Sequence, residues 1–199
     1  FYDLNSLDKL EGMWGFCFYD NDNNKLILSR DLLGERHIFY TIEDNKLIFG
    51  SNAKSVLSIM NNPEYDYESV TTSFMYGSAQ PGKTLIKKIK RLLPGHNLVI
   101  ENNNIKLTNY RNINPEIYYD FINKNVNNKK IIKEHFINLF TDSLKKRIPN
   151  EAKYCYSLSG GLDSTLNCII GSKLTYNKIE SVFMDGNKNT KSGELNEKE

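Results

Sequence analysis

The 199-residue sequence lacks a strong excess of charge of either sign. Its 26 basic and 24 acidic residues leave a formal net charge of only +2. A chain so evenly charged gives no general argument for nucleic acid or an anionic membrane as a partner. The short basic run Lys87–Arg91 alternates with apolar residues. We therefore interpret it as the solvated edge of a strand.

Cysteine and histidine are scarce, with three of each. Cys17, Cys155 and Cys168 each lie in an apolar run, which predicts buried, reduced thiols of a cytoplasmic protein rather than a disulfide framework. The histidines share no ligand spacing with a cysteine, so a zinc-type site is not expected. No apolar run approaches the roughly 20 residues that span a bilayer, and no signal peptide is recognisable.

Strand and turn signals fill residues 12–51. The run MWGFCFYD predicts a strand buried on both faces, and the turn NDNN and the strand KLILSRD follow it. HIFYTI, EDNK and LIFGS repeat this arrangement, so we predict two hairpins of one antiparallel sheet. Apolar positions from Ala53 to Met60 then predict a helix, and YESVTTSFMYG gives a weaker helix signal.

The pattern changes in the second half of the chain. Residues 111–130 are rich in Asn and Lys, and we interpret them as a linker, or else as a surface loop. Apolar positions from Ile132 to Ile148 predict a helix, and KYCYSL, Leu162–Leu174 and IESVFM predict a β-α-β unit with parallel strands. Two domains are therefore expected, over residues 1–110 and 131–199.

The segment SLSGGLDS lies between the first strand of this unit and its helix. Gly160 and Gly161 permit backbone angles closed to other residues, and their amides and the helix N-terminus favour an anion at one point. Ser159 and Ser164 add hydroxyl donors, and an acid such as Asp163 can face phosphate across Mg²⁺. The alternative is an ordinary turn capped by Ser or Asp. The residue set in its strand–loop–helix context favours a phosphate cradle.

These residues resemble the pyrophosphate loop of the ATP-pyrophosphatase superfamily. Upstream, LEGMWGFCFYDNDNNKLILSRDLLGERHIFY is similar to the class II glutamine amidotransferase domain of asparagine synthetases, and so are FGSNAKSVL and LLPGHNL. Asn52, His37 and Arg111 depart from the family pattern, which usually has Glu, Pro and Trp there. The order of these segments identifies the chain as a member of the glutamine-hydrolysing asparagine synthetase family.

The resemblance implies a fold of mixed class, α/β and α+β. A partial αββα amidotransferase sandwich is expected over residues 1–110, followed by the first βαβ of a Rossmann-like ATP-pyrophosphatase domain within residues 131–199. It also implies that the glutaminase nucleophile lies outside this chain, which is then a fragment. The implied activity is synthesis of asparagine from aspartate and glutamine through β-aspartyl-AMP, with release of AMP and pyrophosphate.

The resemblance also assigns residues and partners. Glutamine, aspartate and ATP are the implied small-molecule substrates, the implied location is cytoplasmic, and the family is compatible with a homodimer. Two alternatives stay open: a related amidotransferase acting on a peptide, sugar or antibiotic-precursor carboxylate, and a non-catalytic interaction protein that retains the fold. ATP is expected at Leu158, Ser159, Gly160, Gly161, Leu162, Asp163, Ser164 and Met184, with Mg²⁺ at Asp163 through pyrophosphate.

Overall fold

A computed structural model of the chain describes all residues except 1–6, 8, 103, 150–151, 176–179 and 184–199. It divides into two compact units, Phe1–Asn114 and Pro115–Glu199. We call them unit 1 and unit 2, and each is described by itself.

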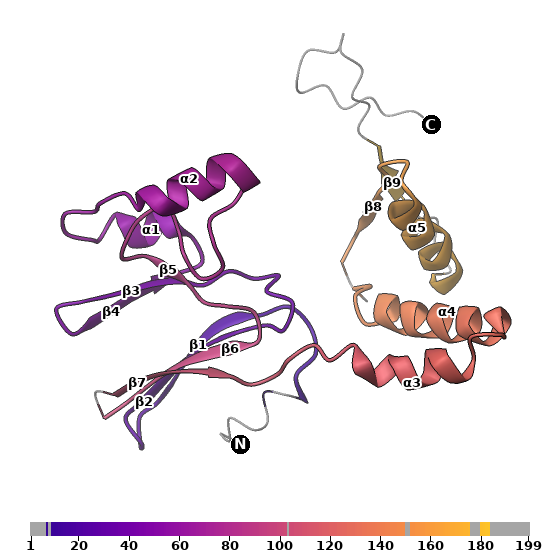
Figure 1. Cartoon of the computed structure of the whole chain (residues 1–199), viewed down its shortest axis with the longest axis horizontal. Helices are drawn as coiled ribbons and strands as arrows, with labels where there is room; N and C mark the ends of the chain where they lie inside the picture. The colour runs from indigo at the N-terminus through magenta and orange to yellow at the C-terminus, as the bar shows by residue number, and fades with distance from the viewer. Residues whose placement is uncertain (1–6, 8, 103, 150–151, 176–179, 184–199) are drawn as a thin grey trace, which may run out of the picture. The chain divides into compact units, whose positions relative to one another are not determined.

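The described residues of unit 1 form two antiparallel sheets (Figure 1). The first contains β1 (Gly15–Asp20), β2 (Lys25–Arg30), β6 (His96–Glu101) and β7 (Asn104–Asn109), in the order β1-β2-β6-β7. The second contains β3 (Phe39–Glu43), β4 (Lys46–Gly50) and the short β5 (Lys90–Arg91), in the order β4-β3-β5.

Both predicted hairpins form, but the prediction that they share one sheet is wrong. The β1–β2 hairpin belongs to the first sheet and the β3–β4 hairpin to the second. Turn residues specify a hairpin locally, whereas the strand that completes each sheet comes from far along the chain. Leu28 of β2 lies opposite Leu98 of β6, and Tyr40 of β3 lies opposite Lys90 of β5.

Two apolar clusters hold unit 1 together. One lies between the sheets and contains Leu28, Ile38, Tyr40, Leu92 and Leu98. The other covers the opposite face of the second sheet and contains Val56, Met60 and Ile89. Apolar burial of this kind is the main favourable term in folding, so the second sheet is covered on both of its faces.

Two short helices follow β4. The helix α1 (Ala53–Leu57) begins at Asn52, whose side chain accepts a hydrogen bond from the amide of Lys54 at 2.8 Å. The helix α2 (Tyr67–Tyr76) begins at Asp66 in the same way and ends at Gly77, whose φ of +79° is in the left-handed region. Asn, Asp and Gly are the residues that these caps favour. Both helices were predicted, α2 from the weaker signal.

Unit 2 contains three helices and a parallel strand pair among its described residues (Figure 1). They are α3 (Glu116–Lys124), α4 (Lys129–Lys145), β8 (Cys155–Ser157), α5 (Leu162–Leu174) and β9 (Glu180–Val182). The strands β8 and β9 pair in parallel, from Cys155 opposite Glu180 to Ser157 opposite Val182. The predicted β-α-β unit is therefore present, and the chain has the mixed class that was expected. That the unit belongs to a Rossmann-like domain stays a prediction.

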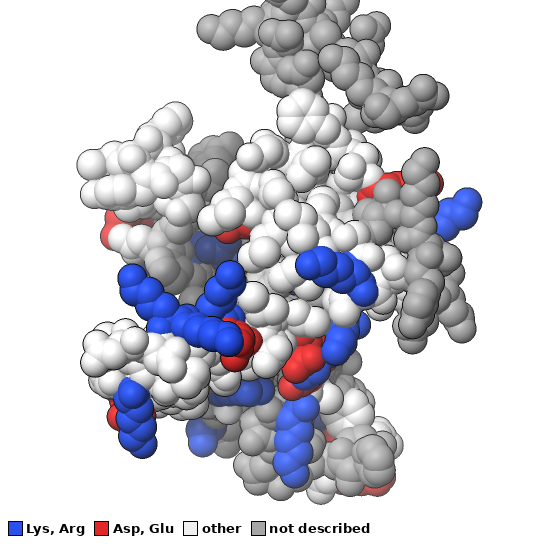
Figure 2. Space-filling model, turned by 90° about the vertical axis from the view of Figure 1, so that its right-hand side faces the viewer, with Lys and Arg blue, Asp and Glu red and all other residues white. Residues whose placement is uncertain are grey.

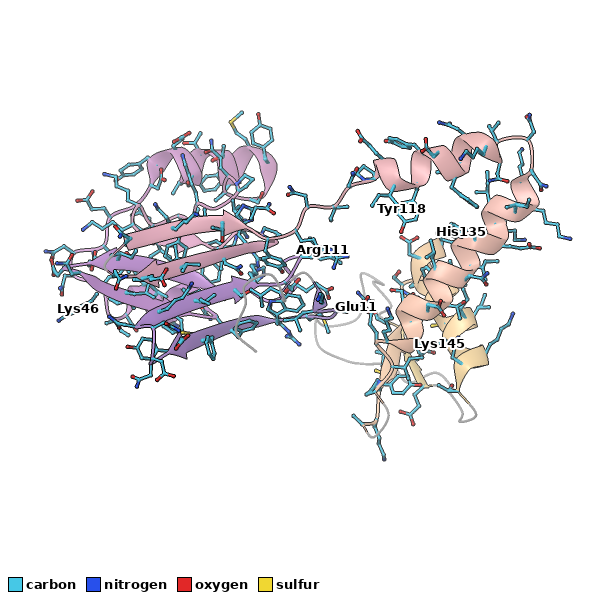
Figure 3. The ribbon with its side chains drawn as sticks, turned by 90° about the horizontal axis from the view of Figure 1, so that it is seen from below. Glu11, Lys46, Arg111, Tyr118, His135 and Lys145 are labelled. Atoms are coloured by element: carbon cyan, nitrogen blue, oxygen red, sulfur yellow. The ribbon has the colours of Figure 1, made fainter. Side chains whose placement is uncertain are left out.

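The segment predicted as a linker contains α3. Its apolar residues at Ile117, Tyr118, Phe121 and Ile122 recur at helical spacing, but the surrounding Asn and Lys residues hid this pattern. The ring of His135 on α4 lies 4.3 Å from that of Phe121 and 6.4 Å from that of Tyr118, between centroids. Figure 3 shows Tyr118 and His135 on the facing sides of the two helices.

Exposure differs from the prediction at the cysteines. Cys17 and Cys155 are exposed and Cys168 is half-buried, so the prediction of three buried thiols is wrong. Strand β1 alternates between exposed and half-buried residues instead of being buried on both faces. The reason is that β1 lies at the edge of its sheet, so a neighbouring strand covers only one of its two sides.

Acidic and neutral side chains stand among the basic ones on the face shown in Figure 2.

Candidate functional site

The predicted phosphate loop joins β8 to α5 in unit 2. Leu158, the first residue after β8, donates its amide hydrogen to the carbonyl oxygen of Val182 at 2.8 Å. The parallel pair therefore extends to the start of the loop, and the loop leaves from the carboxyl end of a strand. In α/β proteins, ligands bind at that end of a parallel sheet.

The two glycines of the loop have different backbone conformations. Gly160 has a φ of +79°, which favours glycine, and a Cβ at this position would meet nothing within 4 Å. Gly161 has φ −78° and ψ 165°, an extended conformation open to any residue. Of the two glycines expected to permit backbone angles closed to other residues, only Gly160 adopts one. A Cβ there would meet only Ser159 Oγ, at 3.5 Å.

The side chain of Ser164 closes the loop. Its hydroxyl donates to the carbonyl oxygen of Gly161 at 3.0 Å and accepts from the amide of Ser159 at 3.2 Å. The hydroxyl of Ser159 lies 3.0 Å from the same oxygen. Because the hydrogen of Ser164 is committed to Gly161, Ser159 is the donor between the two hydroxyls. The structure thus brings Ser159, Gly161 and Ser164 together, and both hydroxyls bond within the loop.

The helix behind the loop begins without a side-chain cap, because its N-cap residue is Gly161. The first amides of a helix have no partner inside the helix, so here they are left for solvent or a ligand. Asp163 lies exposed in this first turn. Leu162 is 82% exposed and Ile169 is 49% exposed, whereas Ile170 is buried, so the helix is packed at Ile170 and not at its first turn. Met184, also expected at the ATP site, lies outside the described residues.

One contact in unit 2 was missed from the sequence. The hydroxyl of Tyr156 on β8 is buried without a hydrogen-bond partner among the described residues. It lies against Gly171 of α5, where a Cβ would overlap its oxygen and ring carbon. The absence of a side chain at Gly171 therefore lets α5 approach β8 closely. The only sequence signal for this contact is a glycine inside a helix.

A second polar cluster lies in unit 1, around the Arg-Asp pair that follows β2. Arg30 is 4% exposed. Its guanidinium donates to the carbonyl oxygens of Arg36, Gly34 and Leu92 and to Nδ1 of His37. These bonds tie residues 34–37 and the end of β5 to β2. The match to the Arg-Asp-x-x-Gly pattern indicated that this segment mattered, but it did not show what Arg30 contacts.

Asp31 organises the turn that follows. Its carboxylate accepts the amides of Glu35 and Arg36, each at 2.9 Å. Burial alone would raise the pKa of Asp31, but these backbone hydrogen bonds lower it below its usual value. Tyr110 donates to the carbonyl oxygen of Arg30 at 2.8 Å and stacks on Trp14. Burial, and then the charge of Asp31, raises the pKa of Tyr110 to about 12.

Comparison with known proteins identifies the family of unit 1. Residues 3–111 match the glutamine amidotransferase domain family, and this match covers more than half of the chain. The chain belongs to that family. The turn at Arg30–Asp31 and the Tyr110 contact both lie inside the matched residues, so they are part of the amidotransferase unit.

The amidotransferase chain is also similar to several longer proteins. It is 30% identical over 161 residues to asparagine synthetase [glutamine-hydrolyzing] 3 of Bacillus subtilis. The matched region covers 80% of this chain and 25% of that protein. It is 28% identical over 181 residues to the asparagine synthetase of Rattus norvegicus (83% and 29%). It is 26% identical over 166 residues to amidase chry2 of Gibberella zeae (82% and 24%).

Two facts follow from these shares. Eighty percent of the chain is more than unit 1 contains, so the similarity extends into unit 2. The chain spans about a quarter of the length of the Bacillus relative.

Within the described part of the chain, no helix is long and apolar enough to cross a membrane, and no cluster of three or more His, Cys, Asp or Glu could hold a metal ion.

Proposed function

We propose that the chain is part of an ATP-dependent asparagine synthase. The observation that carries this proposal is the order of its two parts: an amidotransferase match over residues 3–111 precedes the Ser-Gly-Gly loop of unit 2. Two relatives whose similarity extends over both parts are named asparagine synthetases. An amidotransferase releases ammonia from glutamine, and an ATP-using unit makes a carboxylate reactive toward that ammonia.

The proposed reaction has three balanced steps. Glutamine and water give glutamate and ammonia. The β-carboxylate of aspartate attacks the α-phosphorus of ATP and expels pyrophosphate, which gives β-aspartyl-AMP. Ammonia then attacks the activated carbonyl and expels AMP, which leaves asparagine.

Residues of the loop are proposed to bind ATP through its phosphates. The uncapped amides of the first turn of α5 point along the helix axis, where a negative charge is stabilised. Open space beside the loop could hold the phosphates, since a Cβ on Gly160 would meet nothing within 4 Å. The proposed ATP residues are the described ones of the predicted set: Leu158, Ser159, Gly160, Gly161, Leu162, Asp163 and Ser164.

Asp163 is proposed to hold Mg²⁺ together with the phosphates. Its carboxylate is exposed, and no described residue donates a hydrogen bond to it. Because the described residues contain no complete metal cluster, the remaining ligands would be phosphate oxygens and water, as is usual for Mg²⁺. The ion would supply positive charge next to the leaving pyrophosphate. Asp163 and the loop around it therefore fit a Mg²⁺ ion held together with the phosphates.

A second candidate function is amidation of a different carboxylate. The observation that favours it is the similarity to two proteins named amidases, chry2 and chyE, at 26% identity over nearly the same share of the chain. Under this alternative the ammonia and ATP steps are unchanged and only the activated carboxylate differs. A non-catalytic protein that retains the fold is the third alternative, and the intact loop residues argue against it.

The proposal includes a cytoplasmic location, small-molecule substrates and a homodimer as the assembly. An asparagine auxotroph carrying the whole gene tests the substrate. Growth without asparagine supports asparagine synthase, and failure to grow while the purified protein still consumes ATP and glutamine supports another carboxylate. Loss of both ATP and glutamine consumption in a folded protein would favour the non-catalytic alternative.

Asp163→Asn in the whole protein tests the site. We expect ATP-dependent ligation to fall strongly, because the carboxylate proposed to hold Mg²⁺ is lost, while glutamine hydrolysis is largely retained. The reason for the difference is that Asp163 and the amidotransferase match lie in separate units. Equal loss of both activities in a correctly folded variant would contradict the assignment.

A further inference from the structure

A cavity of about 330 Å³ lies in unit 1. It borders the Arg30 cluster, because the carbonyl oxygen of its lining residue Leu92 accepts a hydrogen bond from Arg30. Part of its lining is apolar: Tyr40, Leu92, Leu93 and Leu107. The other part is basic and comes from one stretch of chain: Lys83, Lys87, Lys90 and Arg91. Small-molecule sites typically combine an apolar lining of roughly this size with a few convergent polar groups.

The basic residues of this stretch differ in their partners. Lys83 pairs with Glu68 and Lys87 with Glu64, each at 2.7 Å, and Lys88 pairs with Glu43 at 3.2 Å. The side chains of Lys90 and Arg91 form no ion pair with any residue that the structure describes. Three of the five cations between residues 83 and 91 are therefore compensated, and the two that are not both line the cavity.

The cavity has no free carboxylate among its lining residues. Asp66 is the acidic residue of the lining, and its oxygens already accept the amide of Ser69 at 3.2 Å and its hydroxyl at 3.1 Å. Arg91 also acts on groups behind the cavity. Burial, and then the charge of Arg91, lowers the pKa of Arg30, which the charge of Asp31 opposes. Arg91 therefore lies close enough to Arg30 for the two positive charges to repel each other.

A solvated strand edge explains only part of this arrangement. It accounts for Lys88, which reaches the exposed side and pairs there with Glu43. It also accounts for Lys90, which is exposed. It does not account for Arg91, which is half-buried beside an apolar cavity and forms no ion pair with a described residue, since an unpaired charge next to apolar surface loses hydration without gaining a partner. An anion in the cavity would remove this cost.

We propose that this cavity binds a small anion with an apolar body, in which a carboxylate or phosphate is carried by a chain or ring of several carbons. The charged group lies against Arg91, whose guanidinium offers a planar pair of donors. The apolar body lies against Tyr40 and Leu107, and its burial supplies the remaining affinity. Nothing in the amidotransferase assignment calls for this ligand.

Calorimetric titration with defined probes tests the proposal. Octanoate and octyl phosphate carry the two candidate head groups, so the tighter of the two identifies the source of the charge. Octanol and octylammonium have the same body without the negative charge, and butyrate has the charge with a shorter body. We expect octanoate or octyl phosphate to bind at least about tenfold tighter than each of these controls.

Two variants place the binding at this cavity. Arg91→Gln is expected to weaken binding of the preferred probe about tenfold or more. Lys106→Gln is the matched control, because it removes the same charge from β7 next to Leu107, and adjacent strand residues point to opposite faces. It is expected to leave the affinity unchanged. Circular dichroism of each variant checks folding, and Arg91→Lys, which keeps the charge but loses the planar pair of donors, replaces Arg91→Gln if the latter does not fold.

Three results would overturn the proposal. Neither anionic probe binds at millimolar concentration, the uncharged and cationic probes bind as tightly, or the Lys106 variant weakens binding as much as the variant at Arg91. The first result means that the cavity holds only water, and the others mean that the probes bind other exposed apolar surface.

Discussion

Nη2 of Arg30 lies 2.7 Å from Nδ1 of His37. A guanidinium can only donate hydrogen bonds, so Nδ1 accepts and the imidazole is neutral. Burial, followed by the charges of Arg30 and Arg91, lowers the pKa of His37 below its ordinary value of 6.5, and the charge of Asp31 partly opposes this. Much of the ring is exposed, and solvent therefore screens these charges.

The first prediction concerns acid. Because the folded pKa of His37 is lowered, the unfolded chain binds this proton more readily than the folded chain. The contribution of His37 to stability is then complete above pH 6.5 and is lost as the pH falls from there through the folded pKa. We predict that the free energy of unfolding falls over this window, and urea titrations at a series of pH values measure it.

His37→Gln should make this loss smaller, because glutamine offers an acceptor oxygen to Arg30 and does not titrate. His96→Gln is the matched control, since Nδ1 of His96 lies 2.7 Å from the carbonyl oxygen of Pro94 and not from a cation. An equal loss of stability in wild type and His37→Gln would contradict this prediction.

The second prediction concerns Arg30 itself. Arg30→Lys keeps the charge but cannot reach the three carbonyl oxygens and the imidazole with one ammonium. We predict a loss of about 2 kcal/mol or more in the free energy of unfolding, since buried acceptors are left without donors. Arg36→Lys, at an exposed position, is the control and should change stability by less than about 0.5 kcal/mol.

The third prediction concerns Gly171, which lies toward the C-terminal end of α5. Alanine normally stabilises a helix interior by about 1 kcal/mol relative to glycine. Here the new Cβ would overlap the ring and hydroxyl of Tyr156, so we predict that Gly171→Ala lowers the melting temperature of unit 2. Tyr156→Phe removes only a hydroxyl that has no described partner and should be neutral or slightly stabilising. A stabilised Gly171→Ala variant would show that β8 and α5 are not in contact here.

The sequence predicted features that depend on neighbouring residues. The helix Leu162–Leu174 has the predicted bounds, because the glycines that precede it and its own apolar residues are close together in the sequence. The two hairpins form as predicted, because their turn residues lie directly between the paired strands. Which strands share a sheet could not be predicted, because β2 pairs with β6 and not with β3, through contacts between residues far apart in the sequence. The same holds for Arg30, whose bond to Leu92 spans 62 residues. Cys17 is apolar in context but exposed by its place on an edge strand.

The fourth prediction separates the two glycines of the loop. Gly160→Ala must force a φ of +79° on alanine, which costs roughly 1–2 kcal/mol and is expected to lower the melting temperature. Gly161→Ala meets no such strain, because φ is −78° and the nearest atom is 3.5 Å away. Its cost should stay near or below about 1 kcal/mol, the penalty of alanine as an N-cap.

Because Gly161→Ala leaves the fold nearly unchanged, it tests the central claim that this loop binds the phosphates of ATP. The measurement is a calorimetric titration of the whole protein with ATP and Mg²⁺, beside a thermal melt without ATP. We predict that the added methyl group, placed where the loop backbone approaches the phosphates, raises the Kd for ATP about tenfold or more, which corresponds to about 1.4 kcal/mol. An unchanged affinity in a folded Gly161→Ala protein would contradict the claim.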